Sequence, residues 1–524
     1  MSLDTLRRRQ WAALFLFGLL ITVPYIIGAL LGDSQHIFGG FLLNPIDGNS
    51  YLAKMYQGWR GDILFHLPYT ADMGNGAFLF VFYLALGHLA RILHLPLIVV
   101  FHSARVISAF FLVWVLFKTL VRNFPAPVFT GTLLAIFLFG LGMGWLALPF
   151  GGLTSDFWVA EAYPFLASYA NPHFPLGLGL MILLLQPFEE FTWIQALKSL
   201  FLAFILALVV PFGVVIVGTV LLINTLVRFY RLRSIGDLKI QITNLVSVGL
   251  LSVPVLIYDY WVTAQDPLFA GWNAQNLTPS PPLWDLILAL SPFLVLLLIG
   301  LIWFRNWYRQ EHDIYLIWLA ASVLLLYLPF GLQRRMMTGI YIPVVWLGCA
   351  VLATLSIGKW TKNRGTFLVL LSIPTTVLVL LAGVAGIMQQ APEIYLWRDE
   401  VEAFDWIEAN TPKDALILAA PDTGLLIPAY TGRRVLYGHP FETVNADDMR
   451  EQAISLLMDL GAGNSANLPQ DVDYVFWGPR EDILVGANPV LPLQVLYTNN
   501  TVTVYSANSS AEQLELLAHT QVPP

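Results

Sequence analysis

The residues best placed to do chemistry lie in a polar segment, 44–72, near the start of an otherwise strongly apolar chain. Asn44-Pro45-Ile46-Asp47-Gly48 is typical of a turn. Apolar side chains then recur at helical spacing, which predicts an amphipathic helix over 48–60 lying at a membrane interface. Asp47 has two compatible interpretations. It caps this helix by accepting hydrogen bonds from free backbone amides, or it is a general base held at the membrane surface.

A second group of charged residues lies further along the chain. Glu161 and Asp156 share the polar segment 150–172, where an acid suits binding of an acceptor or a metal ion; the alternative for both is a solvated loop acid. Arg334 and Arg335 lie between two apolar stretches. A charge beside hydrocarbon is costly and is normally paired or functional. A guanidinium group binds phosphate oxygens in a bidentate manner, so the pair is a candidate phosphate site, with anchoring to lipid head groups as the alternative. Arg105 is a similar candidate at the edge of an apolar stretch.

Other chemical signatures are missing from the sequence. No glycine-rich phosphate loop, Cys-His metal spacing or Ser-His-Asp order stands out. The loop after the first apolar stretch has no Asp-Glu or Asp-Asp pair. A metal site is therefore not predicted there, and a divalent cofactor stays an open alternative.

The composition excludes a soluble globular protein. Hydrophobic residues make up 57% of the 524 residues and charged residues 12%, against about 45–50% and about 25% in soluble proteins. The mean hydropathy of +0.68 agrees with this. The single cysteine, Cys349, excludes an intramolecular disulfide and a cysteine-based metal site.

Eleven apolar stretches predict a polytopic α-helical membrane domain over residues 1–390. A hydrocarbon core of about 30 Å needs about 20 helical residues, and the stretches 173–188 and 196–210 are the shortest relative to that length. The predicted spans are 11–31, 98–121, 127–149, 173–188, 196–210, 212–230, 240–262, 283–304, 313–330, 338–357 and 365–388.

The positions of lysine and arginine predict the orientation in the membrane. If the apolar stretch 76–93 does not cross, 15 of these residues lie on the cytoplasmic side and 6 outside; if it crosses, the counts become 7 and 14. The positive-inside rule favours the first arrangement. We therefore expect 76–93 to dip into the outer leaflet or to pack on the bundle. The N-terminus is then cytoplasmic, and the loop 32–97 lies outside a plasma (inner) membrane.

The tail, residues 391–524, differs from the rest of the chain. It holds 19 acidic and 6 basic residues, whereas residues 1–390 hold 15 and 21. An acidic soluble part without a basic run disfavours nucleic acid as a partner. Turn residues between apolar runs predict a small extracytoplasmic α/β domain. Its expected strands are 415–420, 433–438 and 473–478, with a hairpin over 495–506 and helices at 399–409 and 447–460.

Several short motifs resemble those of one superfamily. Asp47 precedes Tyr51 in the first outer loop, and the further motifs are His66-Leu67-Pro68-Tyr69, Asn171-Pro172-His173-Phe174-Pro175, Gln333-Arg334-Arg335, Trp406-Ile407 and Asn410-Thr411-Pro412. With the architecture of the whole chain, they resemble the GT-C superfamily of membrane glycosyltransferases. Its members use polyprenyl-phosphate sugars and include the protein O-mannosyltransferases and the aminoarabinose transferases. The motifs are short, and the subfamily stays open.

The resemblance implies roles for the candidate residues. Asp47 would deprotonate or orient an acceptor hydroxyl, which attacks the anomeric carbon with inversion while a polyprenyl phosphate leaves. Glu161 would be a second acid at this site. Further substrate contacts are expected from Arg334, Arg335, Arg105, Tyr51, His66, Tyr69, His173, Gln333 and Trp272. The implied partners are a polyprenyl-phosphate-linked sugar, a glycan, lipid or protein acceptor, and membrane lipids. A structural role for each histidine and an aromatic belt for Trp272 are the alternatives.

The main alternative function is a lipid or polysaccharide transporter or flippase without catalysis, and a membrane scaffold is a third. Transporters normally carry ionisable residues within the membrane and internal repeats. Asp259 is the only acid well inside a predicted span, and no repeat is visible. The long acid-bearing first loop favours an enzyme over both alternatives.

Overall fold

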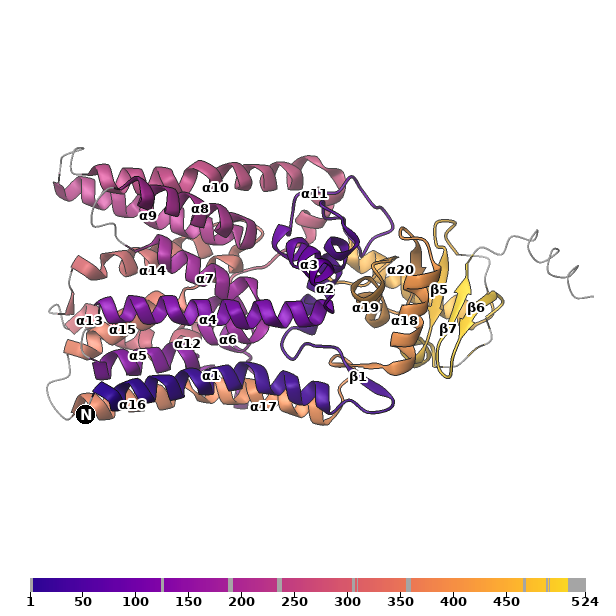
Figure 1. The fold of residues 1–524 in the computed structure, drawn as a ribbon, viewed down its shortest axis with the longest axis horizontal. Coiled ribbons are helices and arrows are strands. Elements are labelled where there is room, and N and C mark those ends of the chain that lie inside the picture. The colour runs from indigo at the N-terminus through magenta and orange to yellow at the C-terminus, as the bar shows by residue number, and fades with distance from the viewer. Residues whose placement is uncertain are drawn as a thin grey trace, which may run out of the picture.

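Apolar helices form most of the chain and lie side by side in a bundle (Figure 1). The computed structural model describes residues 3–123, 127–186, 192–232, 238–303, 307–308, 310–354, 360–464, 468–486, 489 and 491–507. The bundle helices are α1 (Leu3–Leu30), α4 (Leu97–Asn123), α5 (Pro127–Phe139), α7 (His173–Leu184), α8 (Trp193–Val209), α9 (Pro211–Leu232), α10 (Lys239–Gln265), α12 (Leu283–Leu290), α13 (Phe293–Trp303), α14 (Asp313–Leu326), α15 (Tyr341–Thr354), α16 (Trp360–Ser372) and α17 (Pro374–Met388).

Each predicted span coincides with one of these helices or with a helix pair, which confirms the polytopic helical class. Among the described residues, six helices are long and apolar enough to cross a membrane, or eight if two bent pairs each count as one span. Helices α7, α8 and α14 are shorter, at 12, 17 and 14 residues. A straight crossing needs about 20 residues, so the number of eleven crossings stays a prediction. The ends of three predicted spans, at 187–188, 304 and 355–357, lie outside the described residues.

The stretch 76–93 forms a short helix, α3 (Val81–Leu93), that packs against α2 (Pro45–Arg60). Thirteen helical residues rise about 20 Å, which is too little to cross. Two glycines let the helices touch: a Cβ at Gly58 would lie 2.1 Å from the carbonyl oxygen of Leu84, and one at Gly87 would lie 1.9 Å from that of Met55. Helix α2 is consequently buried over most of its length instead of resting half-exposed at an interface.

The acidic tail contains the predicted α/β elements. Its five-stranded sheet has the order β4-β3-β5-β7-β6, parallel among the first three strands and antiparallel among the last three. The strands are β3 (Leu416–Leu418), β4 (Arg434–Val435), β5 (Tyr474–Trp477), β6 (Gln494–Thr498) and β7 (Thr503–Ser506), and the helices are α18 (Arg398–Asn410), α19 (Pro421–Thr431), α20 (Ala446–Gly461) and α21 (Pro479–Val485).

The tail is docked on the first loop. Strand β1 (His36–Phe38) of the loop pairs with β2 (Tyr395–Trp397), which follows the last bundle helix. Helix α19 packs against α2. Figure 1 shows α2 and α3 between the bundle and the sheet, at the end of the bundle opposite the N-terminus. This arrangement brings the first loop and the tail to one face of the bundle.

Candidate functional site

Asp47 lies in the first turn of α2. The residue that precedes the helix is Asn44, with φ of 52°, and Pro45 begins the helix. The interpretation of Asp47 as the N-cap is therefore wrong, although a carboxylate in the first turn still interacts favourably with the helix dipole. Its side chain is partly exposed and has no hydrogen-bond partner in the described part of the chain. Asp47 is thus available to an incoming group.

One face of α2 carries several polar side chains. Asp47, Ser50, Tyr51 and Lys54 recur at spacings that place residues on the same side of a helix. The Lys54 side chain is fully buried, and its ammonium lies 4.3 Å from the centre of the Phe80 ring. A buried ammonium needs compensating partners, so this face must meet acceptors supplied by other segments.

The arginine pair lies close to this face. Both residues belong to a 3₁₀ helix, η8 (Gln333–Met337), between α14 and α15. The Nη1 of Arg335 donates to Oε1 of Glu161 at 3.2 Å, and the Arg334 guanidinium stacks 4.6 Å from the centre of the Trp158 ring. Both arginines interact electrostatically with Asp47. The pair therefore points toward other protein charges, which a purely lipid-facing anchor would not do.

The solvated interpretation of the acids in segment 150–172 is wrong. Glu161, in η4 (Ala160–Ala162), is 5% exposed and holds Arg335. Asp156, in η3 (Ser155–Phe157), is fully buried and accepts hydrogen bonds from Thr154 Oγ1 at 2.6 Å and from the Gly144 amide at 3.0 Å. Asp156 is thereby occupied in holding its own loop. Of the two acids, only Glu161 belongs to the charged cluster, which consists of Asp47, Glu161, Arg334 and Arg335.

Aromatic rings pack behind Asp47. The Tyr51 ring stacks on Tyr83 with 4.3 Å between centroids, and His173 lies edge-on to Tyr51 at 5.2 Å. A 2.6 Å hydrogen bond joins Tyr83 Oη and His173 Nδ1. Burial, followed by the charge of Asp47, raises the pKa of Tyr51 well above its usual range. Tyr51 therefore stays a neutral phenol.

The structure does not bring Arg105 into this cluster. Its guanidinium is almost fully buried and donates to the carbonyl oxygens of Ile21 at 2.8 Å and Ser168 at 3.0 Å, while its Nε donates to His102 Nδ1. It also stacks on Tyr25 at 4.3 Å. These contacts tie together α1, α4 and α6 (Pro164–Ala170), so Arg105 is engaged in packing.

The remaining predicted contacts lie around the cluster. Gln333 accepts from the Ser280 amide and donates to the Leu328 carbonyl, which fixes the turn that carries the arginines. Tyr69 is buried, donates to the carbonyl oxygen of Leu425 and lies 5.5 Å from the ring of His439. His66 and Trp272 hold the first loop: the His66 backbone pairs with Gln57, and Trp272 packs on Phe80 and Phe269.

Comparisons with solved structures find a likeness that extends over nearly the whole chain. The chain is similar to ArnT from Cupriavidus metallidurans bound to undecaprenyl phosphate, with a TM-score of 0.47 and 14% identity over 94% of this chain and 98% of that one. The apo state of ArnT gives the same TM-score and identity over 95% and 99%. No protein-family model and no curated protein matches the chain. At 14% identity, the chemistry has to be argued from the residues of this chain.

The tail supplies two cluster residues that the sequence does not reveal. Oε1 of Glu442 accepts hydrogen bonds from Ser50 and, at 2.7 Å, from Lys54, which lies 388 residues away in the chain. Burial alone would raise the pKa of Glu442, but Lys54 and His439 reverse the effect and lower it. Burial lowers the pKa of His439, although Glu442 and Asp47 oppose this shift. Spacing on α2 could have identified Lys54, since it lies seven residues after Asp47.

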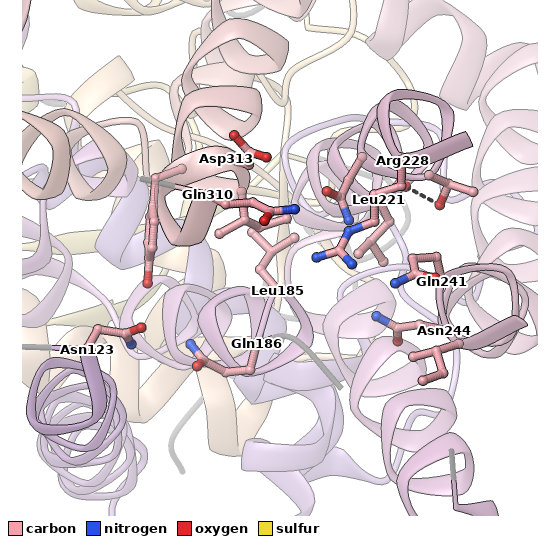
Figure 2. A pocket seen from close by; sticks show the side chains of 14 residues that line it. Asn123, Leu185, Gln186, Leu221, Arg228, Gln241, Asn244, Gln310 and Asp313 are labelled. Atoms are coloured by element: carbon pink, nitrogen blue, oxygen red, sulfur yellow. Dashed lines mark hydrogen bonds between the residues drawn. The ribbon is translucent and has the colours of Figure 1, made fainter. Parts of the chain in front are cut away.

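A separate cavity lies at the other end of the bundle. It measures about 130 Å³ and is lined by Asn123, Gln186, Arg228, Gln241, Asn244 and Asp313, among others (Figure 2). Small-molecule pockets usually measure about 300–1,000 Å³, and polar cavities of smaller size commonly hold water. Among the described residues, no group of three or more His, Cys, Asp or Glu side chains is placed to hold a metal ion there or elsewhere.

Proposed function

We propose that this chain is an integral-membrane glycosyltransferase of the GT-C type that transfers a sugar from a polyprenyl-phosphate donor to an acceptor hydroxyl at the outer face of the membrane. The observation that carries the proposal is the electrostatic interaction of Asp47 with the arginine pair. The Asp47 carboxylate has no hydrogen-bond partner among the described residues, and it interacts with two guanidinium groups from a turn that is distant in the sequence, one of which is held by Glu161. This combination provides a base beside a site for an anion.

The proposed reaction is a single displacement. The acceptor oxygen forms a bond to the anomeric carbon, and the bond from that carbon to the phosphate oxygen breaks on the opposite side, which inverts the configuration. The electron pair of the broken bond stays with the leaving polyprenyl phosphate. The hydroxyl proton passes to Asp47, and general-base catalysis of this kind typically contributes about 10²–10⁴-fold.

Arg334 and Arg335 have the complementary role in this proposal. Negative charge grows on the phosphate as its bond to the sugar breaks, and fixed cations stabilise that charge more in the transition state than in the ground state. Glu161 positions Arg335 by its 3.2 Å contact, and the Trp158 ring positions Arg334. The proposal therefore assigns stabilisation of the leaving group to the arginines.

The test uses the purified chain in detergent with a panel of undecaprenyl-phosphate-linked hexoses and pentoses, together with glycan, lipid and peptide acceptors. The readout is release of undecaprenyl phosphate, which does not depend on the acceptor's identity. We expect Asp47→Asn to lower the rate by about 10²–10⁴-fold. The control, Asp72→Asn, removes an exposed acid of the same loop and should retain activity.

Two outcomes would contradict the proposal. Wild-type turnover in Asp47→Asn would remove the carboxylate from the chemistry. Movement of a lipid-linked sugar across proteoliposomes without release of undecaprenyl phosphate would favour the transporter.

A further inference from the structure

The loop 438–444 of the tail is built around His439. Its Nδ1 accepts hydrogen bonds from the backbone amides of Phe441 and Glu442, both at 3.1 Å. A nitrogen that accepts two amide protons carries no proton itself, so the neutral ring has its proton on Nε2. The Thr443 hydroxyl oxygen accepts from the amides of Gly438 and His439. These bonds fix both the loop and the tautomer of His439.

The membrane part holds this loop from the other side. The Gln275 side chain, at the end of α11 (Pro267–Gln275), donates to the carbonyl oxygen of Thr443 and accepts from the Asn445 amide. Ser50 and Lys54 hold one oxygen of Glu442. A loop that is fixed by contacts on both sides presents its remaining polar atoms in a preorganised geometry.

Two polar atoms of this loop have no partner. Nε2 of His439 and Oε2 of Glu442 are buried and make no hydrogen bond to any described residue, and the two residues are 2% and 8% exposed. Buried polar atoms are nearly always hydrogen-bonded, because leaving one unpaired costs free energy. The hydrogen bonds described above involve only Nδ1 of His439 and Oε1 of Glu442. The unpaired atoms are one donor and one acceptor, and His439 interacts electrostatically with Asp47.

We propose that His439 and Glu442 form a hydroxyl-binding subsite, in which Nε2–H of His439 donates to, and Oε2 of Glu442 accepts from, hydroxyl groups of the bound substrate. This inference rests on the proposed function and extends the site into the tail. A sugar ring or a polyol offers hydroxyl groups that both donate and accept. An anionic group is disfavoured here by the Glu442 carboxylate. The hydroxyl groups belong either to the sugar of the donor or to the acceptor.

Two variants separate binding from a structural role. His439→Asn keeps a side-chain oxygen close to Nδ1 that can accept from the two loop amides, as asparagine does in turns, but removes the Nε2–H donor. His439→Gln keeps a donor with reach similar to Nε2 but loses the acceptor for the loop amides. We expect His439→Gln to melt at a lower temperature and His439→Asn to melt near the wild type. Asp448→Asn, an exposed site on the following helix, is the control.

The binding measurement compares undecaprenyl phosphate with the same lipid carrying each sugar of the panel, by competition on the purified full-length chain. If the subsite binds the donor sugar, the wild type prefers a sugar-bearing lipid, and His439→Asn lowers that preference about tenfold, as expected for one lost hydrogen bond of about 1.4 kcal/mol. If it binds the acceptor, the preference is unchanged and the acceptor KM rises about tenfold. Glu442→Gln should act on the same quantity as His439→Asn.

The outcomes distinguish this inference from the proposed function. Loss of sugar preference in a chain that transfers no sugar would support the subsite and contradict the enzyme. If the wild type transfers sugar, an unchanged sugar preference together with an unchanged acceptor KM in His439→Asn would overturn the subsite. If the wild type transfers no sugar, an unchanged sugar preference in His439→Asn would by itself overturn the subsite. Equal melting losses in His439→Asn and His439→Gln would also overturn it, because the histidine would then act through the loop fold alone.

Discussion

The buried ion pair between Lys54 and Glu442 yields a prediction with a defined magnitude. The two side chains are 0% and 11% exposed and lie 2.7 Å apart, so water screens them little. Lys54→Met leaves the Glu442 carboxylate with the Ser50 hydroxyl as its one remaining side-chain partner in the described structure. Breaking a buried pair by removing one partner typically costs about 3–5 kcal/mol, and we expect Lys54→Met to fall in this range.

The variant of the other partner, Glu442→Gln, is expected to lower the stability less than Lys54→Met does. Glu442→Gln keeps an oxygen that accepts from Ser50 and Lys54, and the ammonium retains the faces of Phe80 at 4.3 Å and Tyr51 at 5.4 Å. Cation–π contacts of a desolvated ammonium contribute about 2 kcal/mol or more, so the ammonium stays partly compensated, and we expect a loss of about 1–3 kcal/mol. The double variant removes both charges. It should cost less than the sum of the singles, with a coupling of about 0.5–3 kcal/mol.

The assay is thermal unfolding of the four proteins in one detergent at pH 7, followed by tryptophan fluorescence at a fixed heating rate. Membrane proteins commonly unfold irreversibly, so the order of the midpoints is the readout. The controls are Lys413→Met and Asp448→Asn, which remove exposed charges of the tail. Additive midpoint shifts, or a Lys54→Met midpoint equal to that of Lys413→Met, would refute the reasoning, because the pair would then not hold the tail on α2.

The other predictions concern the arginines, pH and orientation. Arg334→Ala and Arg335→Ala should lower kcat by about 10²–10³-fold and weaken donor binding, and lysine should restore only part of this because it lacks the planar fork; unchanged donor kinetics in the double variant would make the pair a lipid anchor. Burial lowers the pKa of His439 below its ordinary value of 6.5. The stability that the neutral imidazole contributes is therefore fully present above pH 6.5, and it is lost as the pH falls toward and through the lower pKa of the folded state. The melting midpoint should therefore fall between pH 7 and pH 5, and less in His439→Asn; parallel pH profiles would contradict this. In a chain whose single buried cysteine is replaced by alanine, Asn500→Cys should react with an impermeant thiol reagent on intact cells and Gln310→Cys should not, and the reverse pattern would place the tail in the cytoplasm.

Features with a local signal could be predicted from the sequence. Helices and strands reveal themselves by the period and length of their apolar runs, and the bundle helices, α2 and the strands of the tail lie where these runs predict. The arginine pair was recognisable because charge between apolar stretches is rare. Arg105 carries the same signal but is satisfied by backbone carbonyls. A charge pattern does not distinguish a ligand-binding guanidinium from one that joins helices.

Features that depend on distant segments could not be predicted. The lysine and the glycines of α2 are visible in the local sequence. The contact of Lys54 with Glu442, however, depends on how the tail docks, and no sequence pattern near residue 442 predicts it. The close approach of Gly58 to Leu84 likewise becomes meaningful only once α3 is known to lie against α2. Tertiary contacts of this kind also decide between the two interpretations of Glu161, which is not a solvated acid but the buried partner of Arg335.

Helix α2 explains why the candidate site includes both parts of the chain. Its glycine-bearing side packs on α3, and its polar face must satisfy a fully buried ammonium. The bundle contributes the arginines and Glu161 on the Asp47 side of this face, and the tail contributes Glu442 at Lys54. If the tail were a separate module, the Lys54 ammonium would lose its carboxylate partner. A charge without that partner is unfavourable beside the rings of Tyr51 and Phe80. The tail is therefore part of the structure that holds Asp47 in place.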